Sequence, residues 1–133
     1  MNKVLWTLQV LLALAFLAHG LLVLFPPASV VEQMNASMST EFRVFLGIAE
    51  VLAAVGLTLP GITGIQPWWT QWAAAGVMIV MISATIYHVM RNEIGPAVTT
   101  LVLLVMATCV AYMRWKVLPI ARSQDARRRS TFG

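Results

Sequence analysis

The sequence has little charge and almost no cysteine. Only 11% of its 133 residues are charged, whereas an average soluble domain has about 25%. The single cysteine, Cys109, excludes an intramolecular disulfide, a paired-cysteine redox centre and a cysteine-based zinc cluster. Hydrophobic residues make up 59% of the chain, which excludes intrinsic disorder and leaves too few polar side chains to cover a water-facing surface. The composition therefore indicates a protein that faces lipid.

Four apolar stretches are long enough to cross a membrane, whose hydrocarbon core of about 30 Å needs roughly 20 apolar residues per helix. The predicted helices cover residues 4–25, 42–59, 71–90 and 96–115. No segment shows the alternation of apolar and polar residues that is typical of strands. We therefore predict an all-α fold, a four-helix transmembrane bundle with antiparallel neighbours. Residues 1–118 form this membrane domain, and residues 119–133 form a basic tail that we expect to be disordered.

Lysine and arginine are distributed unequally between the two ends of the predicted bundle. With four spans both termini lie on one side, and that side holds seven of the nine basic residues. The positive-inside rule therefore predicts cytoplasmic termini and a multi-pass membrane protein. We expect the basic residues on this side to contact lipid headgroups, namely Arg114, Lys116, Arg122, Arg127, Arg128 and Arg129. Because no folded scaffold or interleaved aromatic residues accompany the arginines, we predict a lipid bilayer as the partner and no nucleic acid.

Glu50, His19 and His88 are ionisable residues inside the predicted spans. A charge at the middle of a bilayer costs about 2.5–3.5 kcal/mol, so such residues usually face the interior of the bundle and mark functional sites. Counted from the non-cytoplasmic surface, Glu50 lies roughly 10 Å deep, His19 roughly 9 Å and His88 roughly 4–5 Å. We therefore expect these three side chains to share one layer in the outer, non-cytoplasmic half of the bundle.

Helical spacing places further polar groups at this depth. Thr99 and Thr100 enter from the same side on the fourth span, and Arg91 and Glu93 follow the third. We therefore predict a pocket with Arg91 and Glu93 at its mouth and with candidate ligand contacts at His19, Glu50, His88, Thr99 and Thr100. Within it, Glu50 could pair with either histidine.

This polar layer allows three interpretations. Its residues could hydrogen-bond one another and fix the register of the helices, or they could line a binding or redox pocket for a lipophilic small molecule. His19, Glu50 and His88 could also ligate a metal. Three single residues on separate helices carry no metal-ligand spacing, so we predict no metal site. The sequence requires no cofactor and is compatible with a bound quinone.

Three short motifs resemble the DoxX-like family of small bacterial membrane proteins. The stretch from Phe45 to Pro60, with Gly47, Glu50, Gly56 and Leu57, is similar to the second span of that family. His88-Val89-Met90-Arg91-Asn92-Glu93 resembles the end of its third span, and His19-Gly20 fits its first. The resemblance covers about residues 4–118. It implies a four-helix protein of the bacterial inner membrane without a bound cofactor. It also implies that Glu50 and His88 are the positions of interest, with Arg91 and Glu93 beside them.

The family takes its name from a subunit of a thiosulfate:quinone oxidoreductase, and most of its members have no assigned activity. We accordingly favour a non-catalytic accessory or binding subunit and assign no catalytic residue. Its outer-half pocket would hold a quinone or a lipid, or the subunit would serve a partner such as a membrane redox enzyme. One alternative is an oxidoreductase subunit working at the quinone level. Another is a small transporter or channel, which four spans without a discontinuous helix pair do not favour.

Overall fold

The computed structural model describes residues 2–66, 68–117, 120 and 123–131, and within these ranges it contains helices and no strands. The four long helices are α1 (Asn2–Leu24), α3 (Thr40–Thr63), α4 (Trp69–Met90) and α5 (Ile94–Tyr112). A π-helical turn, η1 (Met113–Val117), continues α5, and two shorter helices are α2 (Ala28–Ser37) and α6 (Ser123–Thr131). The four long segments are each long and apolar enough to cross a membrane, which confirms the predicted four-helix fold.

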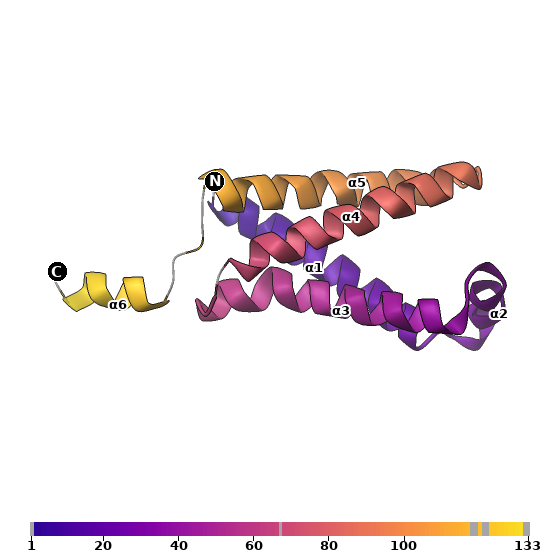
Figure 1. Ribbon diagram of the computed structural model, residues 1–133, viewed down its shortest axis with the longest axis horizontal. Coiled ribbons are helices and arrows are strands. Elements are labelled where there is room, and N and C mark those ends of the chain that lie inside the picture. Colours follow the sequence, from indigo (N-terminus) through magenta and orange to yellow (C-terminus); the bar gives the residue numbers. More distant parts are fainter. Residues whose placement is uncertain (1, 67, 118–119, 121–122, 132–133) are drawn as a thin grey trace.

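The long helices pack as two pairs, α1 with α3 and α4 with α5, and α3 and α4 join the pairs. Figure 1 shows α3 and α5 running along opposite sides of the bundle, while α1 and α4 cross between them. At the end of the bundle where α1 begins, here called the terminal end, all four helices come together. Toward the opposite end, which carries α2, the two pairs move apart (Figure 1).

The hydrophobic core follows this arrangement. Its fully enclosed members include Leu12 on α1, Leu57 on α3, Ala74 on α4 and Val110 on α5. All four lie in the half of their helix that is nearer the terminal end. Many of the other apolar side chains on the helices are exposed, as expected for surfaces that face lipid rather than water. The most enclosed part of the core therefore lies toward the terminal end of the bundle.

Sequence signals at both ends explain the length of α3. At its start the Ser39 hydroxyl accepts a hydrogen bond from the Phe42 N–H at 3.3 Å, which satisfies one of the free donors of the first turn. At its end Gly64 adopts a left-handed conformation with φ of 66°, and its N–H donates to the Pro60 carbonyl. The prediction ended this helix at residue 59, because proline removes a backbone donor. The structure instead extends it by a further turn, to the glycine cap.

The two short helices lie in segments that the prediction left without structure. α2 occupies the connection between α1 and α3, and none of its residues is buried. α6 lies in the tail for which the sequence predicts disorder. Its last turn carries Arg128 and Arg129, where positive charge is favourable because a helix C-terminus has a partial negative charge. Arg127, Arg128 and Arg129 are all exposed.

Candidate functional site

A hydrogen-bonded pair, His19 and Glu50, joins α1 to α3. His19 Nδ1 lies 2.7 Å from Glu50 Oε2. The two side chains differ in environment, because that of His19 is 55% exposed and that of Glu50 only 5%. Glu50 stands about 15 Å along α3 from its first residue, near the middle of the helix. The structure thus brings together two of the predicted site residues and encloses the carboxylate.

Two glycines next to the pair allow this contact. A Cβ added to Gly20 of α1 would lie 3.0 Å from the carbonyl oxygen of Gly47 on α3 and 3.1 Å from Glu50 Cβ. A Cβ added to Gly47 would lie 2.6 Å from Leu24 Cγ. Small residues allow membrane helices to approach closely, since backbone can then pack on backbone. The close crossing of α1 and α3 therefore places the imidazole within reach of the carboxylate.

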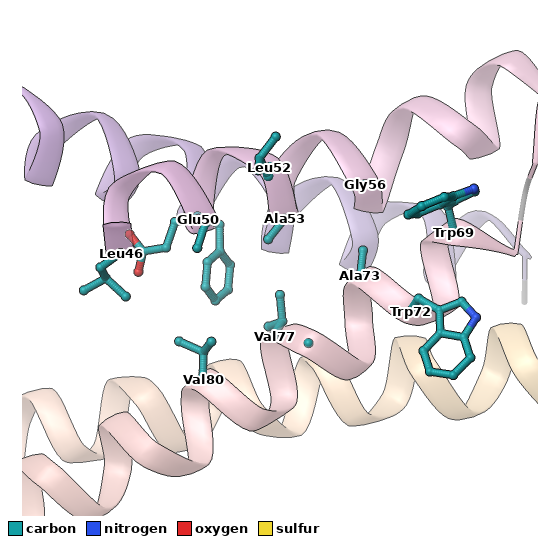
Figure 2. A pocket seen from close by; sticks show the side chains of 13 residues that line it. Leu46, Glu50, Leu52, Ala53, Gly56, Trp69, Trp72, Ala73, Val77 and Val80 are labelled. Carbon is teal, nitrogen blue, oxygen red and sulfur yellow. The ribbon is translucent and has the colours of Figure 1, made fainter. Parts of the chain in front are cut away.

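A groove of about 360 Å³ lies between α3 and α4, beside Glu50. Figure 2 shows Glu50 and Leu46 at one end of it and Trp69 and Trp72 at the other. Small residues on both helices leave the space open, namely Ala49, Ala53 and Gly56 on α3 and Ala73 and Gly76 on α4. A Cβ added to Gly76 would have no atom within 4 Å, so this position faces empty space. The feature is accordingly an open, apolar groove that runs along two helices.

Among the described residues that line the groove, Glu50 is the only one with an ionisable side chain. Its Oε2 atom takes the hydrogen bond with His19. Within the described part of the chain, no hydrogen bond is made to its other oxygen, Oε1. An ionised carboxylate can only accept hydrogen bonds. The groove therefore contains one acceptor atom that the protein itself leaves without a donor.

The structure places His88 away from this pair. His88 Nδ1 lies 2.6 Å from Glu93 Oε2, and Arg91 Nε donates to Glu93 Oε1 at 3.0 Å. These three residues surround the turn between α4 and α5. The hydrogen bond with His88, and then that from Arg91, lower the pKa of Glu93, and the same contact raises the pKa of Arg91. Of the two alternatives for Glu50, the pairing with His88 is therefore not the one formed, because the two helix pairs lie apart at this end of the bundle.

The two candidate threonines are also separate from Glu50. Thr99 is exposed, and its hydroxyl donates to the Gly95 carbonyl of its own helix at 3.1 Å. The Thr100 hydroxyl lies 2.9 Å from that of Thr85 and links α5 to α4. The structure thus does not gather the candidate residues into the expected single pocket. Its residues fall in three places, and the groove extends from the middle of α3 toward the terminal end.

Arg114 occupies a different place from the one predicted. We expected headgroup contact, but Arg114 is only 2% exposed. Its Nε donates to Gln9 Oε1 at 2.9 Å, and its Nη1 donates to Asn2 Oδ1 at 3.0 Å. The guanidinium also lies over the Trp6 ring, 5.0 Å from its centroid. The π-helical turn η1 carries Arg114, so the side chain enters the bundle instead of extending into the headgroup region.

One signal of this polar cluster is present in the sequence, although it does not identify Arg114 as a partner. Gln9 stands in the middle of an apolar stretch, where a side-chain amide needs partners inside the bundle. It is fully buried, and its amide nitrogen donates to the Leu57 carbonyl on α3. Of the other residues predicted to contact headgroups, Lys116 is exposed, and Arg122 lies outside the described residues. The described part of the chain contains no group of three histidine, cysteine or acidic residues that could hold a metal ion.

Comparison with known proteins gives one match. A family model described as the DoxX-like family matches residues 7–110. No curated protein and no solved structure matches the chain. The matched range runs from the first helix to the last part of α5, so it includes the groove and both polar pairs.

Proposed function

The chain belongs to the DoxX-like family of membrane proteins, and from this premise we propose that it is a non-catalytic binding subunit that holds a lipophilic molecule in the groove between α3 and α4. The observation that carries the proposal is the groove itself. An apolar channel with a single enclosed carboxylate at one end matches the general pattern of ligand sites, which are mostly apolar and fix orientation with a few polar groups.

The size and exposure of the groove support this function. Its volume of about 360 Å³ falls within the range of roughly 300–1,000 Å³ that small-molecule sites occupy. From Leu46 to Gly56 it follows α3 for about 15 Å, which suits an extended chain better than a compact ring system. Leu52 and Trp72 line the groove and are 64% and 56% exposed, so a molecule can enter sideways from the lipid.

Photochemical labelling tests the proposal. A long-chain alcohol with a diazirine in its tail is irradiated with the purified protein in a nonionic detergent, and the labelled peptides are identified by mass spectrometry. We expect labels on the segments of α3 and α4 that line the groove. Gly76→Phe should reduce this labelling about tenfold, because the ring would occupy space that the alkyl tail needs, a loss of about 1.4 kcal/mol of binding free energy.

Gly95 supplies the matched control. An added Cβ there also has no atom within 4 Å, but Gly95 lies at the start of α5 and does not line the groove. Gly95→Phe should therefore leave the labelling unchanged. Equal labelling of α3 and α4 in both variants and in the unaltered protein would show that the probe coats the lipid-facing surface and occupies no site, which would refute the proposal.

A further inference from the structure

We infer that the groove selects single-chain amphiphiles whose headgroup donates a hydrogen bond, and that Glu50 is the residue that selects them. A primary ammonium headgroup binds most strongly and a hydroxyl headgroup next. This inference rests on the proposed function, since it concerns the ligand of the same groove. Glu50 has more hydrogen-bond acceptor atoms than the described part of the protein supplies donors for. The Glu50 side chain is 95% enclosed and lines the groove, and its hydrogen bond with His19 is made through Oε2, which leaves Oε1 as an acceptor for a ligand.

His19 determines which carboxylate oxygen remains available. Its Nδ1 lies 2.7 Å from Oε2, which fixes the carboxylate in one orientation. His19 is thus a positioning residue, and Oε1 is the atom that an entering headgroup meets. Because an acceptor surrounded by hydrocarbon is unfavourable when it has no donor, a headgroup that supplies a donor is stabilised relative to one that does not.

The remaining groove residues give no competing recognition near Glu50. Leu46 and Ala53 lie one turn to either side of it on the same face of α3, and neither has a polar side-chain atom. The indole groups of Trp69 and Trp72 are the other polar lining groups, and Figure 2 shows both at the far end with their nitrogen atoms directed away from Glu50. A headgroup beside Glu50 therefore meets one acceptor and otherwise hydrocarbon.

The chemistry of the carboxylate disfavours other headgroups. An ionised fatty acid would bring a second carboxylate next to Glu50, and when both are ionised like charges repel strongly where the local dielectric constant is low. An ester or a quinone carbonyl can only accept hydrogen bonds, so it leaves Oε1 without a donor. An ammonium group supplies both a donor and the opposite charge, and charge-assisted hydrogen bonds are the strong ones.

Competition labelling tests the inference. Unlabelled amphiphiles of equal chain length, with an amine, an alcohol, a methyl ester or a carboxylic acid as headgroup, compete with the diazirine alcohol for the groove. The amine and the alcohol should displace the probe at about tenfold lower concentration than the ester and the acid, a difference of about 1.4 kcal/mol. In Glu50→Gln the amide offers both a donor and an acceptor, so the preference for the amine over the acid should disappear.

A second variant keeps the test decisive if Glu50→Gln does not fold, which a thermal unfolding curve would reveal. Leu46→Lys retains Glu50 and adds an ammonium group one helical turn away. It should likewise remove the preference for the amine. An unchanged order of the four headgroups in either folded variant would overturn the role of Glu50.

The outcomes separate this inference from the function on which it rests. Equal displacement by all four amphiphiles, together with loss of labelling in Gly76→Phe, would mean that the groove holds any alkyl chain, including that of a bilayer phospholipid. That result overturns the headgroup inference and supports the binding function. Labelling that does not respond to Gly76→Phe overturns both.

Discussion

Gly20 of α1 faces the backbone carbonyl of Gly47 on α3, so closely that a Cβ on Gly20 would lie 3.0 Å from that oxygen. His19 is the neighbour of one glycine in sequence, and Glu50 is three residues from the other. The helix crossing and the buried hydrogen bond are therefore a single structural unit. Altering the crossing must alter the position of the carboxylate in the groove.

Gly20→Ala tests this dependence. The added methyl group needs space that Gly47, Glu50 and Val51 already occupy, so we expect a loss of about 1–3 kcal/mol in the free energy of unfolding, as for other overpacked sites. Thermal unfolding in detergent, followed by circular dichroism, measures it. Gly95→Ala is the control, because its methyl group meets no atom within 4 Å and should leave the transition unchanged or raise it. Equal unfolding temperatures for the two variants would contradict the close crossing.

Arg114→Lys tests the polar cluster at the terminal end. The guanidinium donates hydrogen bonds to both Gln9 and Asn2, and a lysine ammonium cannot reproduce that planar geometry. We expect a loss of about 1–3 kcal/mol in unfolding free energy, because Gln9 would lose a buried partner.

Lys116→Arg is the matched control for Arg114→Lys, since Lys116 is exposed on the same turn, and it should change the unfolding free energy by no more than about 0.5 kcal/mol. If the two variants were equally stable, Arg114 would act as an ordinary headgroup contact.

The Glu93 carboxylate makes stability depend on pH at the turn between α4 and α5. Because the hydrogen bonds with His88 and Arg91 lower its folded-state pKa below the ordinary value of 4.5, the unfolded chain binds the proton more readily. The stabilisation is therefore complete above the ordinary value and is lost as the pH falls through the lowered pKa.

Unfolding temperatures measured between neutral pH and pH about 3 should thus decline less steeply in Glu93→Gln than in the unaltered protein. Glu32→Gln, which alters an exposed glutamate of α2, should keep the original decline. Parallel curves for Glu93→Gln and the unaltered protein would rule out the contribution of Glu93.

The four helices could be predicted because hydrophobic length is a local property of the sequence. The prediction also selected Glu50 and His19, because ionisable residues are rare in apolar spans. The choice of the histidine that pairs with Glu50 is not a local property of the sequence. It depends on the glycine crossing near Gly20 and on the separation of the two helix pairs, and neither can be read from the depth of a residue along its own helix.

The position of Arg114 was unpredictable for a related reason. Its place at the end of the last span is equally consistent with a headgroup contact and with a turn inward. The π-helical turn and the distant partners Asn2 and Gln9 decide between the two. A prediction from hydropathy places an arginine at a helix end in the interfacial region, because it contains no information about the facing helix.

The two tryptophans at the end of the groove give the protein an intrinsic optical signal. Trp69 and Trp72 both line the groove and are 53% and 56% exposed, and the Trp68 and Trp69 rings stack with their centroids 5.1 Å apart. Indole emission responds to the polarity and the quenchers around the ring. A bound alkyl chain that carries bromine atoms near its tail would therefore quench the fluorescence of these two residues, so occupancy of the groove becomes measurable without any label attached to the protein.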